Sequence, residues 1–137
     1  MKNFEIFATT ADVGIRFSGR DFAGLYGNAV AGLNALLFGT ANEPPAANNS
    51  QRFRFRGDSA ENVLVNLLAE VLSLAYQNKK RVVTMEFFSA DMRALDANFR
   101  LAMIAAAPAV DIKAVTYHKL RVVEKDGLKK AAVLFDI

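Results

Sequence analysis

Apolar and polar residues alternate over the first part of the chain in a way that predicts two short strands. The first covers about residues 3–8, and alternation resumes in Val13-Gly14-Ile15-Arg16-Phe17 after a polar break at residues 9–12. From Phe22 onwards apolar residues recur at spacings of three and four, which predicts a helix with one buried face up to Leu37. Asp21 is a suitable N-cap, and Gly39 suits the left-handed position after the helix.

The middle of the chain predicts a loop, a strand and a second helix. Thr40–Ser50 contains two prolines and paired asparagines and cannot continue either period, so we expect a surface loop. An alternating Arg-Phe strand follows at residues 51–56 and ends at Gly57. Asp58-Ser59-Ala60-Glu61 resembles a capping box, and the helix behind it is expected to run to about Asn78.

Four strands are predicted for the remainder, at residues 82–88, 95–103, 114–123 and 129–135. We expect the last two to form a hairpin, because Asp126-Gly127 is a preferred tight-turn pair. The element order is then ββα-βα-ββββ. It predicts an α+β fold, a two-layer sandwich in which two helices pack on one face of a mostly antiparallel sheet. No linker divides the chain, so residues 1–137 are expected to form a single domain.

Composition excludes several classes of protein and of metal site. The chain is 53% hydrophobic and 23% charged, outside the range of disordered proteins. No apolar run approaches the length of a membrane span, and charges within Met1–Glu5 disfavour an export signal, so we expect a cytoplasmic protein without a membrane partner. Without cysteine, and with His118 as the single histidine, any metal site must use oxygen ligands.

The net charge of +3 is a mild basic excess, far from that of a dedicated nucleic-acid binder. Arginine and phenylalanine alternate at residues 52–56, and Lys79-Lys80-Arg81 forms a second basic cluster. Such a strand can stack bases and contact phosphates. We favour the simpler interpretation, an amphipathic strand with its phenylalanines inward and its arginines in water.

The strongest candidate for a functional site lies at the two ends of the chain. Asp136 and the terminal carboxylate of Ile137 follow an apolar strand, and Asp12 lies in the polar break near the start. If the ends meet, three carboxylates come together, and hard divalent cations require several oxygen ligands. The alternatives are a turn-closing role for Asp12 and a solvated strand end for Asp136.

Two further residues are candidates without a defined role. Under strict alternation His118 would share a strand face with Thr116 and Leu120, where a packed or hydrogen-bonded histidine is more common than a catalyst; its proton affinity lies near neutrality. Lys113 could bind a phosphate, pair with Asp12, or simply be a solvated strand-end charge. The chain has neither a glycine-rich phosphate loop nor a nucleophile motif.

Three strings of residues resemble the archease family: Thr10-Ala11-Asp12-Val13-Gly14-Ile15, Lys113-Ala114-Val115-Thr116-Tyr117-His118, and Leu134-Phe135-Asp136-Ile137. They occur in the right order over the whole length, with two helices between them. The resemblance implies a non-catalytic partner of the RNA-splicing ligase, which joins cyclic-phosphate and hydroxyl RNA ends with GTP and a metal in tRNA splicing or RNA repair. Family members are understood to promote guanylylation and multiple turnover of that ligase.

The resemblance also implies a ligand set. Asp12, Asp136 and Ile137 carry over as ligands of a divalent cation, calcium first, with magnesium and manganese as alternatives. Lys113 and His118 carry over as motif positions. RNA would be reached through the ligase, and no small-molecule substrate is implied. The chain departs from the family at Thr9, where a histidine is usual; threonine is a poor metal ligand.

Two rival functions use the same residues differently. A metal-dependent phosphoesterase could use the acids with His118 or a carboxylate as general base. A single-stranded RNA-binding module could use residues 52–56 with Lys79-Lys80-Arg81, although the modest net charge argues against it.

Overall fold

The computed structural model describes residues 3–41 and 43–137. Met1 and Lys2, part of the segment that disfavours an export signal, and Asn42, within the expected loop, lie outside the described residues. The elements are, in order, β1 (Phe4–Ala8), β2 (Val13–Gly19), α1 (Phe22–Phe38), β3 (Asn49–Arg56), α2 (Ala60–Gln77), β4 (Lys80–Ala90), β5 (Ala94–Met103), β6 (Ala114–Val115), β7 (Val123–Lys125) and β8 (Leu128–Asp136). Neither described helix has the length and apolar character needed to cross a membrane.

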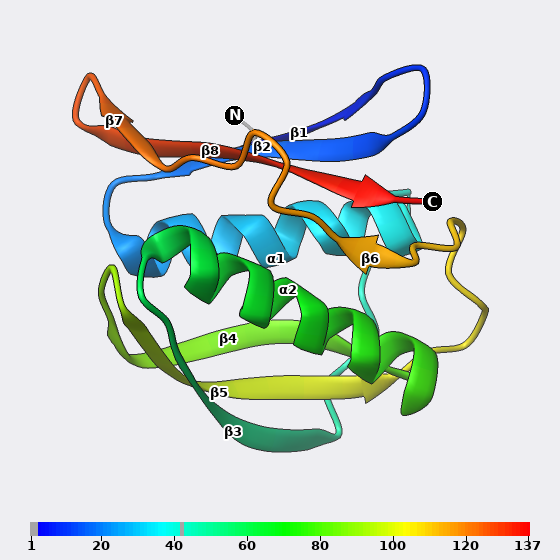
Figure 1. Cartoon of the computed structure of the whole chain (residues 1–137). Helices are drawn as coiled ribbons and strands as arrows, with labels where there is room; N and C mark the ends of the chain where they lie inside the picture. The colour runs from blue at the N-terminus through cyan, green and yellow to red at the C-terminus, as the bar shows by residue number, and fades with distance from the viewer. Residues whose placement is uncertain (1–2, 42) are drawn as a thin grey trace.

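The strands form two antiparallel sheets with both helices between them (Figure 1). One sheet has the order β1-β2-β8-β6, with β7 also paired to β8, and the other has the order β3-β5-β4. The α+β class, the antiparallel pairing and the two helices are therefore confirmed, and the helices cover one face of each sheet. The layer arrangement differs from the prediction, because the strands divide between two sheets and make three layers.

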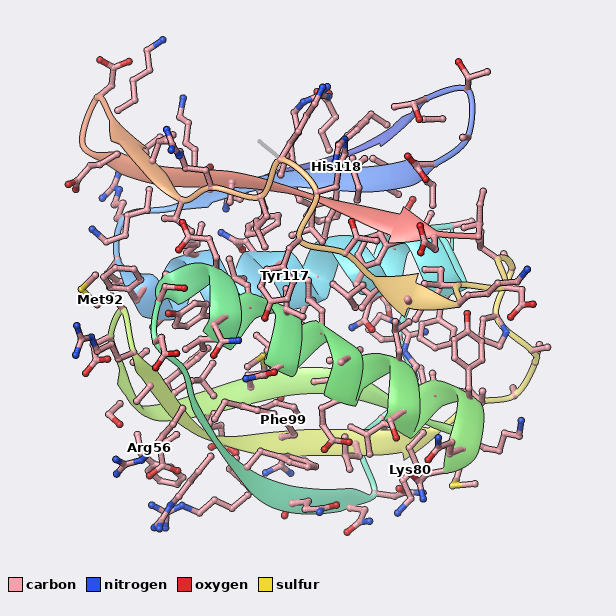
Figure 2. The ribbon with its side chains drawn as sticks, viewed as in Figure 1. Arg56, Lys80, Met92, Phe99, Tyr117 and His118 are labelled. Atoms are coloured by element: carbon pink, nitrogen blue, oxygen red, sulfur yellow. The ribbon has the colours of Figure 1, made fainter. Side chains whose placement is uncertain are left out.

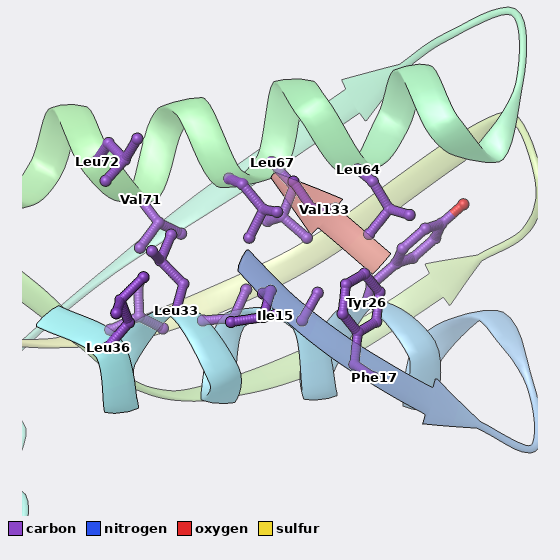
Figure 3. Close-up of a cluster of buried hydrophobic side chains, with 14 of the residues drawn as sticks. Ile15, Phe17, Tyr26, Leu33, Leu36, Leu64, Leu67, Val71, Leu72 and Val133 are labelled. Atoms are coloured by element: carbon purple, nitrogen blue, oxygen red, sulfur yellow. The ribbon is translucent and has the colours of Figure 1, made fainter. Parts of the chain in front are cut away.

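The composition of α1 explains the third layer. Adjacent positions such as Leu25 and Tyr26, or Leu36 and Leu37, are buried together. Neighbouring residues of a helix point in different directions, so this helix is covered on more than one side. Figure 3 shows side chains of both helices meeting Ile15, Phe17 and Val133 of the five-stranded sheet in one cluster.

Side chains cap both helices. Asp21 Oδ1 accepts a hydrogen bond from the N–H of Gly24 at 2.7 Å, as the prediction of an Asp21 N-cap requires. At α2 the predicted capping box is wrong: Ser59 is the N-cap, and its Oγ accepts from the N–H of Asn62 at 3.1 Å. Glu61 instead accepts a hydrogen bond from the N–H of Val122 at 2.7 Å, so it holds a distant segment against the helix.

The three-stranded sheet confirms the amphipathic interpretation of the Arg-Phe strand. Phe53 and Phe55 pack against the core, and the ring of Phe53 lies 4.6 Å from that of Phe99 between centroids. Figure 2 shows Phe99 on the sheet and Arg56 at the end of β3. Because the phenylalanines face the helices, they are not available to stack bases.

The strand expected at residues 114–123 is wrong. Only Ala114–Val115 and Val123–Lys125 are strands, and both pair with β8. Between them the chain turns: the N–H of Leu120 donates to the carbonyl oxygen of Tyr117 at 3.0 Å, and Lys119 has a left-handed φ of 56°. The part of the chain after α2 therefore has five strands where four were expected. The tight turn predicted at Asp126-Gly127 is confirmed, since both residues have positive φ.

Candidate functional site

The two ends of the chain meet at one end of the five-stranded sheet. Strands β2 and β8 are antiparallel neighbours whose last paired residues are Val13 and Phe135. Extending this register by one residue places Asp12 opposite Asp136. Figure 1 shows the C-terminal end of β8 beside the turn between β1 and β2. The two aspartates thus lie on neighbouring strands at the same end of the sheet.

The alternation of side chains places both carboxylates on the outer face of this sheet. Phe135 is buried and Val13 packs against the core, so these two residues face the helices. Successive residues of a strand point to opposite faces. Asp12 and Asp136 therefore face away from the core; Asp136 is exposed and Asp12 is half-buried. Both offer hard oxygen atoms to solvent.

Thr9 closes the turn that presents Asp12. Its N–H donates to the carbonyl oxygen of Asp12 at 2.9 Å, and its Oγ1 accepts from the N–H of Asp12 at 3.0 Å. Within residues 3–41 and 43–137, the carboxylate of Asp12 makes no hydrogen bond or ion pair. A turn-closing carboxylate at Asp12 is therefore not observed, because the Thr9 hydroxyl has that role.

Lys113 lies at the same end of the sheet, on the other edge of β8. Its N–H donates to the carbonyl oxygen of Asp136 at 2.8 Å, and the register Ala114–Asp136 places it opposite Ile137. By alternation its side chain is on the face opposite to the two carboxylates. Among the described residues it forms no ion pair with Asp12. Lys113 thus contacts the acidic end through its main chain.

His118 is not part of this group. It lies in the turn at residues 117–120, is exposed, and its N–H donates to Thr116 Oγ1 at 3.3 Å. The predicted strand face shared with Thr116 and Leu120 is wrong, because the chain reverses there. Figure 2 shows His118 at this turn and Tyr117 beside α2.

The donor set suits a hard cation but does not complete a coordination shell. The described part of the chain contains no group of three or more His, Cys, Asp or Glu side chains that could hold a metal ion. The available protein ligands are the carboxylates of Asp12 and Asp136 and the main-chain oxygens of Ile137. Calcium takes about six to eight oxygens. The remaining positions would fall to water or to a partner molecule.

Two contacts that the sequence pattern did not predict hold the Lys113–His118 motif and the following segment in place. Asn62 Nδ2 donates to the hydroxyl of Tyr117 at 2.6 Å, and Glu61 accepts from the N–H of Val122. Both partners come from the first turn of α2. In the sequence, the only sign of these contacts is that Glu61 and Asn62 are polar residues at the start of a helix. Glu61 matched a capping motif equally well, so its contact with Val122 could not be inferred.

Comparisons with known proteins find similarity over the whole chain. The model of the Archease protein family (MTH1598/TM1083) matches residues 4–137. The curated Protein archease of Methanothermobacter thermautotrophicus is 25% identical over 145 residues, covering 100% of both chains. The solution structure of Methanobacterium thermoautotrophicum protein 1598 has a TM-score of 0.77 at 24% identity, with 100% of each chain covered. The crystal structure of an archease, possible chaperone, from Thermotoga maritima has a TM-score of 0.68 at 19% identity, covering 97% of this chain and 96% of that one.

Proposed function

Because the chain belongs to the archease family, we propose that it is a non-catalytic accessory protein that activates an RNA-splicing ligase. In this role it promotes guanylylation of the ligase and allows it to turn over many times in tRNA splicing or RNA repair. The observation that carries the proposal is the pairing of β2 with β8, whose register sets Asp12 opposite Asp136 on an outward face. We place the protein in the cytoplasm with its ligase.

The acidic end would hold a divalent cation, calcium first, with magnesium or manganese as alternatives. Asp12, Asp136 and the main-chain oxygens of Ile137 are the ligands in this proposal. A bound cation would supply positive charge and open coordination positions at the surface of the molecule. Because the protein offers so few ligands, its affinity is expected to be moderate, which suits presentation of the ion to a partner. The two carboxylates would also repel each other less with a cation between them.

Lys113 and His118 have secondary roles in this proposal. The main-chain hydrogen bond of Lys113 to Asp136 holds the strand end that carries the carboxylate. His118 is exposed on a turn and is free to contact the ligase.

The arrangement favours an accessory role over a metal-dependent phosphoesterase. Hydrolysis needs a general base within reach of the reacting water. His118, the only histidine, lies in a separate turn, and no third acidic side chain joins Asp12 and Asp136 in the described part of the chain. Hydrolysis of cyclic-phosphate RNA by the purified protein alone, lost in Asp12→Asn, would instead support the enzyme.

A turnover assay with the cognate ligase tests the proposal. The ligase is supplied with excess cyclic-phosphate and hydroxyl RNA ends, with and without this protein. With the wild-type protein, each ligase molecule is expected to complete many turnovers. With Asp12→Asn or Asp136→Asn, each ligase molecule is expected to complete only one. Asp126→Asn is the matched control, because Asp126 lies in the turn at the other end of β8. Stimulation by both site variants equal to that by wild type would show that the site is wrongly assigned.

A further inference from the structure

A basic groove lies farther along β2 and β8, the strands that lead to Asp12 and Asp136. A cavity of about 910 Å³ lies against β1, β2 and β8, reaches the C-terminal end of α1 at Ala35, Gly39 and Thr40, and is bordered by Lys119 and Arg121. Its lining contains the cations Arg16, Lys119, Arg121 and Lys130. We call this surface the basic groove.

The charge of the basic groove is concentrated. Among the described residues of its lining Glu5 is the only acid, so these residues carry a net charge of +3, the same as that of the whole chain. Arg16 is paired with that carboxylate at 2.7 Å. Lys119, Arg121 and Lys130 form no ion pair within residues 3–41 and 43–137. A hollow lined by one sign of charge focuses its field on a ligand of the opposite sign.

Two of the four cations are held in defined positions. Arg16 lies over the ring of Phe7 with its guanidinium carbon 4.0 Å from the centroid, in addition to its ion pair with Glu5. Lys119 is fixed by the turn at residues 117–120, where it adopts a left-handed φ of 56° that non-glycine residues rarely adopt. The segment carrying Lys119 is in turn tied to α2 through Glu61. The four cations of the basic groove are therefore brought together by tertiary contacts from three separate parts of the chain.

From these observations we infer that the basic groove binds the phosphate backbone of single-stranded RNA. The choice of RNA rests on the proposed function, because the ligase acts on RNA ends. The geometry also indicates the direction in which a bound RNA strand would run. Asp12, immediately before β2, and Arg16 within β2 share the outer face, about 13 Å apart at ~3.3 Å per residue. A strand whose phosphates lie in the basic groove can therefore lead its end towards Asp12 and Asp136.

The test measures binding of a fluorescent single-stranded RNA oligonucleotide to the full-length protein by anisotropy at several salt concentrations. Wild type is expected to bind, with an affinity that falls as salt rises, by a log–log slope of about −0.7 for each phosphate contacted. The variant Lys119→Asn/Arg121→Ala/Lys130→Ala is expected to lose at least tenfold in affinity and about two units of slope. Asparagine is used at position 119 because it tolerates the left-handed backbone.

The matched control removes the same charge from the other sheet. Arg54→Ala/Arg56→Ala/Arg93→Ala changes three exposed arginines of the three-stranded sheet and its turn, and it is expected to bind RNA as wild type does. Equal binding by the groove variant, or an equal loss in the control, would overturn the inference. So would displacement of RNA by polyglutamate at equal charge concentration, since that would point to an acidic protein partner.

The RNA-binding assay and the ligase assay can give different outcomes, so they test the two proposals independently. Asp12→Asn with Asp136→Asn is expected to keep RNA binding while losing ligase stimulation. A protein that stimulates the ligase but never binds RNA would refute the basic groove and leave the accessory function standing.

Discussion

Gly14 shows how one residue of the Thr-Ala-Asp-Val-Gly motif serves packing rather than chemistry. A Cβ atom at this position would lie 2.5 Å from Cζ of Phe7 and 2.7 Å from the carbonyl oxygen of Val133. The first neighbour is a side chain, but the second is the backbone of β8. The strand that carries Asp136 therefore approaches β2 so closely that only glycine fits.

Gly14→Ala is expected to lower the free energy of unfolding by about 1–3 kcal/mol, because the added methyl group must push two strands apart. Gly27→Ala is the control: its Cβ would meet Phe87 at 3.6 Å, an ordinary contact. Because alanine favours a helix over glycine, that variant is expected to be stabilised by about 0.5–1 kcal/mol. Urea unfolding measures the free energy of unfolding of both variants. A Gly14→Ala protein as stable as wild type would contradict the packing argument.

Asp96 provides a pH-dependent contribution to stability. A side-chain hydrogen bond from Arg52 holds the pKa of the Asp96 carboxyl below its usual range. The contribution is thus present above the pKa of the unfolded carboxyl, about 3.9, and is lost as the pH falls through the lower pKa of the folded state. Wild type is expected to be more stable than Asp96→Asn at pH 7, with the difference vanishing in strong acid. Urea unfolding across this range is the measurement, and a difference independent of pH would rule out the pairing.

At the level of elements, the segment between β6 and β7 decides where the functional motifs lie. Its pattern of apolar residues resembles that of a strand, but the chain turns at residues 117–120 and is held by α2. Local alternation cannot reveal this, because the partners of Tyr117 and Val122 come from a helix more than fifty residues earlier. The helices and the Asp126-Gly127 turn were predictable because the hydrophobic periodicity, the Asp21 cap of α1 and the Asp-Gly pair are local signals.

Glu61→Ala should loosen this segment without disturbing the sheet. Removing the carboxylate leaves the N–H of Val122 without its acceptor, so amide hydrogen exchange is expected to rise at residues 116–122 and to stay unchanged in the centre of β8. Glu70→Ala, at the other glutamate of α2, is expected to leave that exchange unaltered. Equal protection at Val122 in wild type and Glu61→Ala would show that the tether does not hold the segment.

At the level of the whole molecule, the three-layer arrangement determines where the candidate functional site can lie. With the helices enclosed between two sheets, the outer face of the five-stranded sheet is left to carry polar chemistry, with carboxylates at one end and cations farther along. Class and antiparallel pairing followed from hydrophobic periodicity. The division into two sheets did not follow from it, because strand pairing depends on contacts between distant segments. The one indication in the sequence was that apolar residues are adjacent along α1, where the structure buries them together.

The basic groove could not be predicted from the sequence either, because its cations are distant from one another along the chain. Arg16, Lys119, Arg121 and Lys130 are scattered over three segments, and only the register of β2 with β8 and the turn at residues 117–120 bring them together. The acidic end could be proposed from the sequence because its two aspartates stand at the ends of predicted strands.

Calcium titration followed by the unfolding midpoint tests the central claim, a cation held by the two chain ends, most directly. A ligand that binds only the folded state stabilises it by about 2.7 kcal/mol at 100 times its Kd. Wild type and Asp126→Asn are expected to gain stability as calcium rises, whereas Asp12→Asn and Asp136→Asn are expected to gain none. A wild-type protein whose stability is unchanged by calcium, magnesium or manganese would contradict the account.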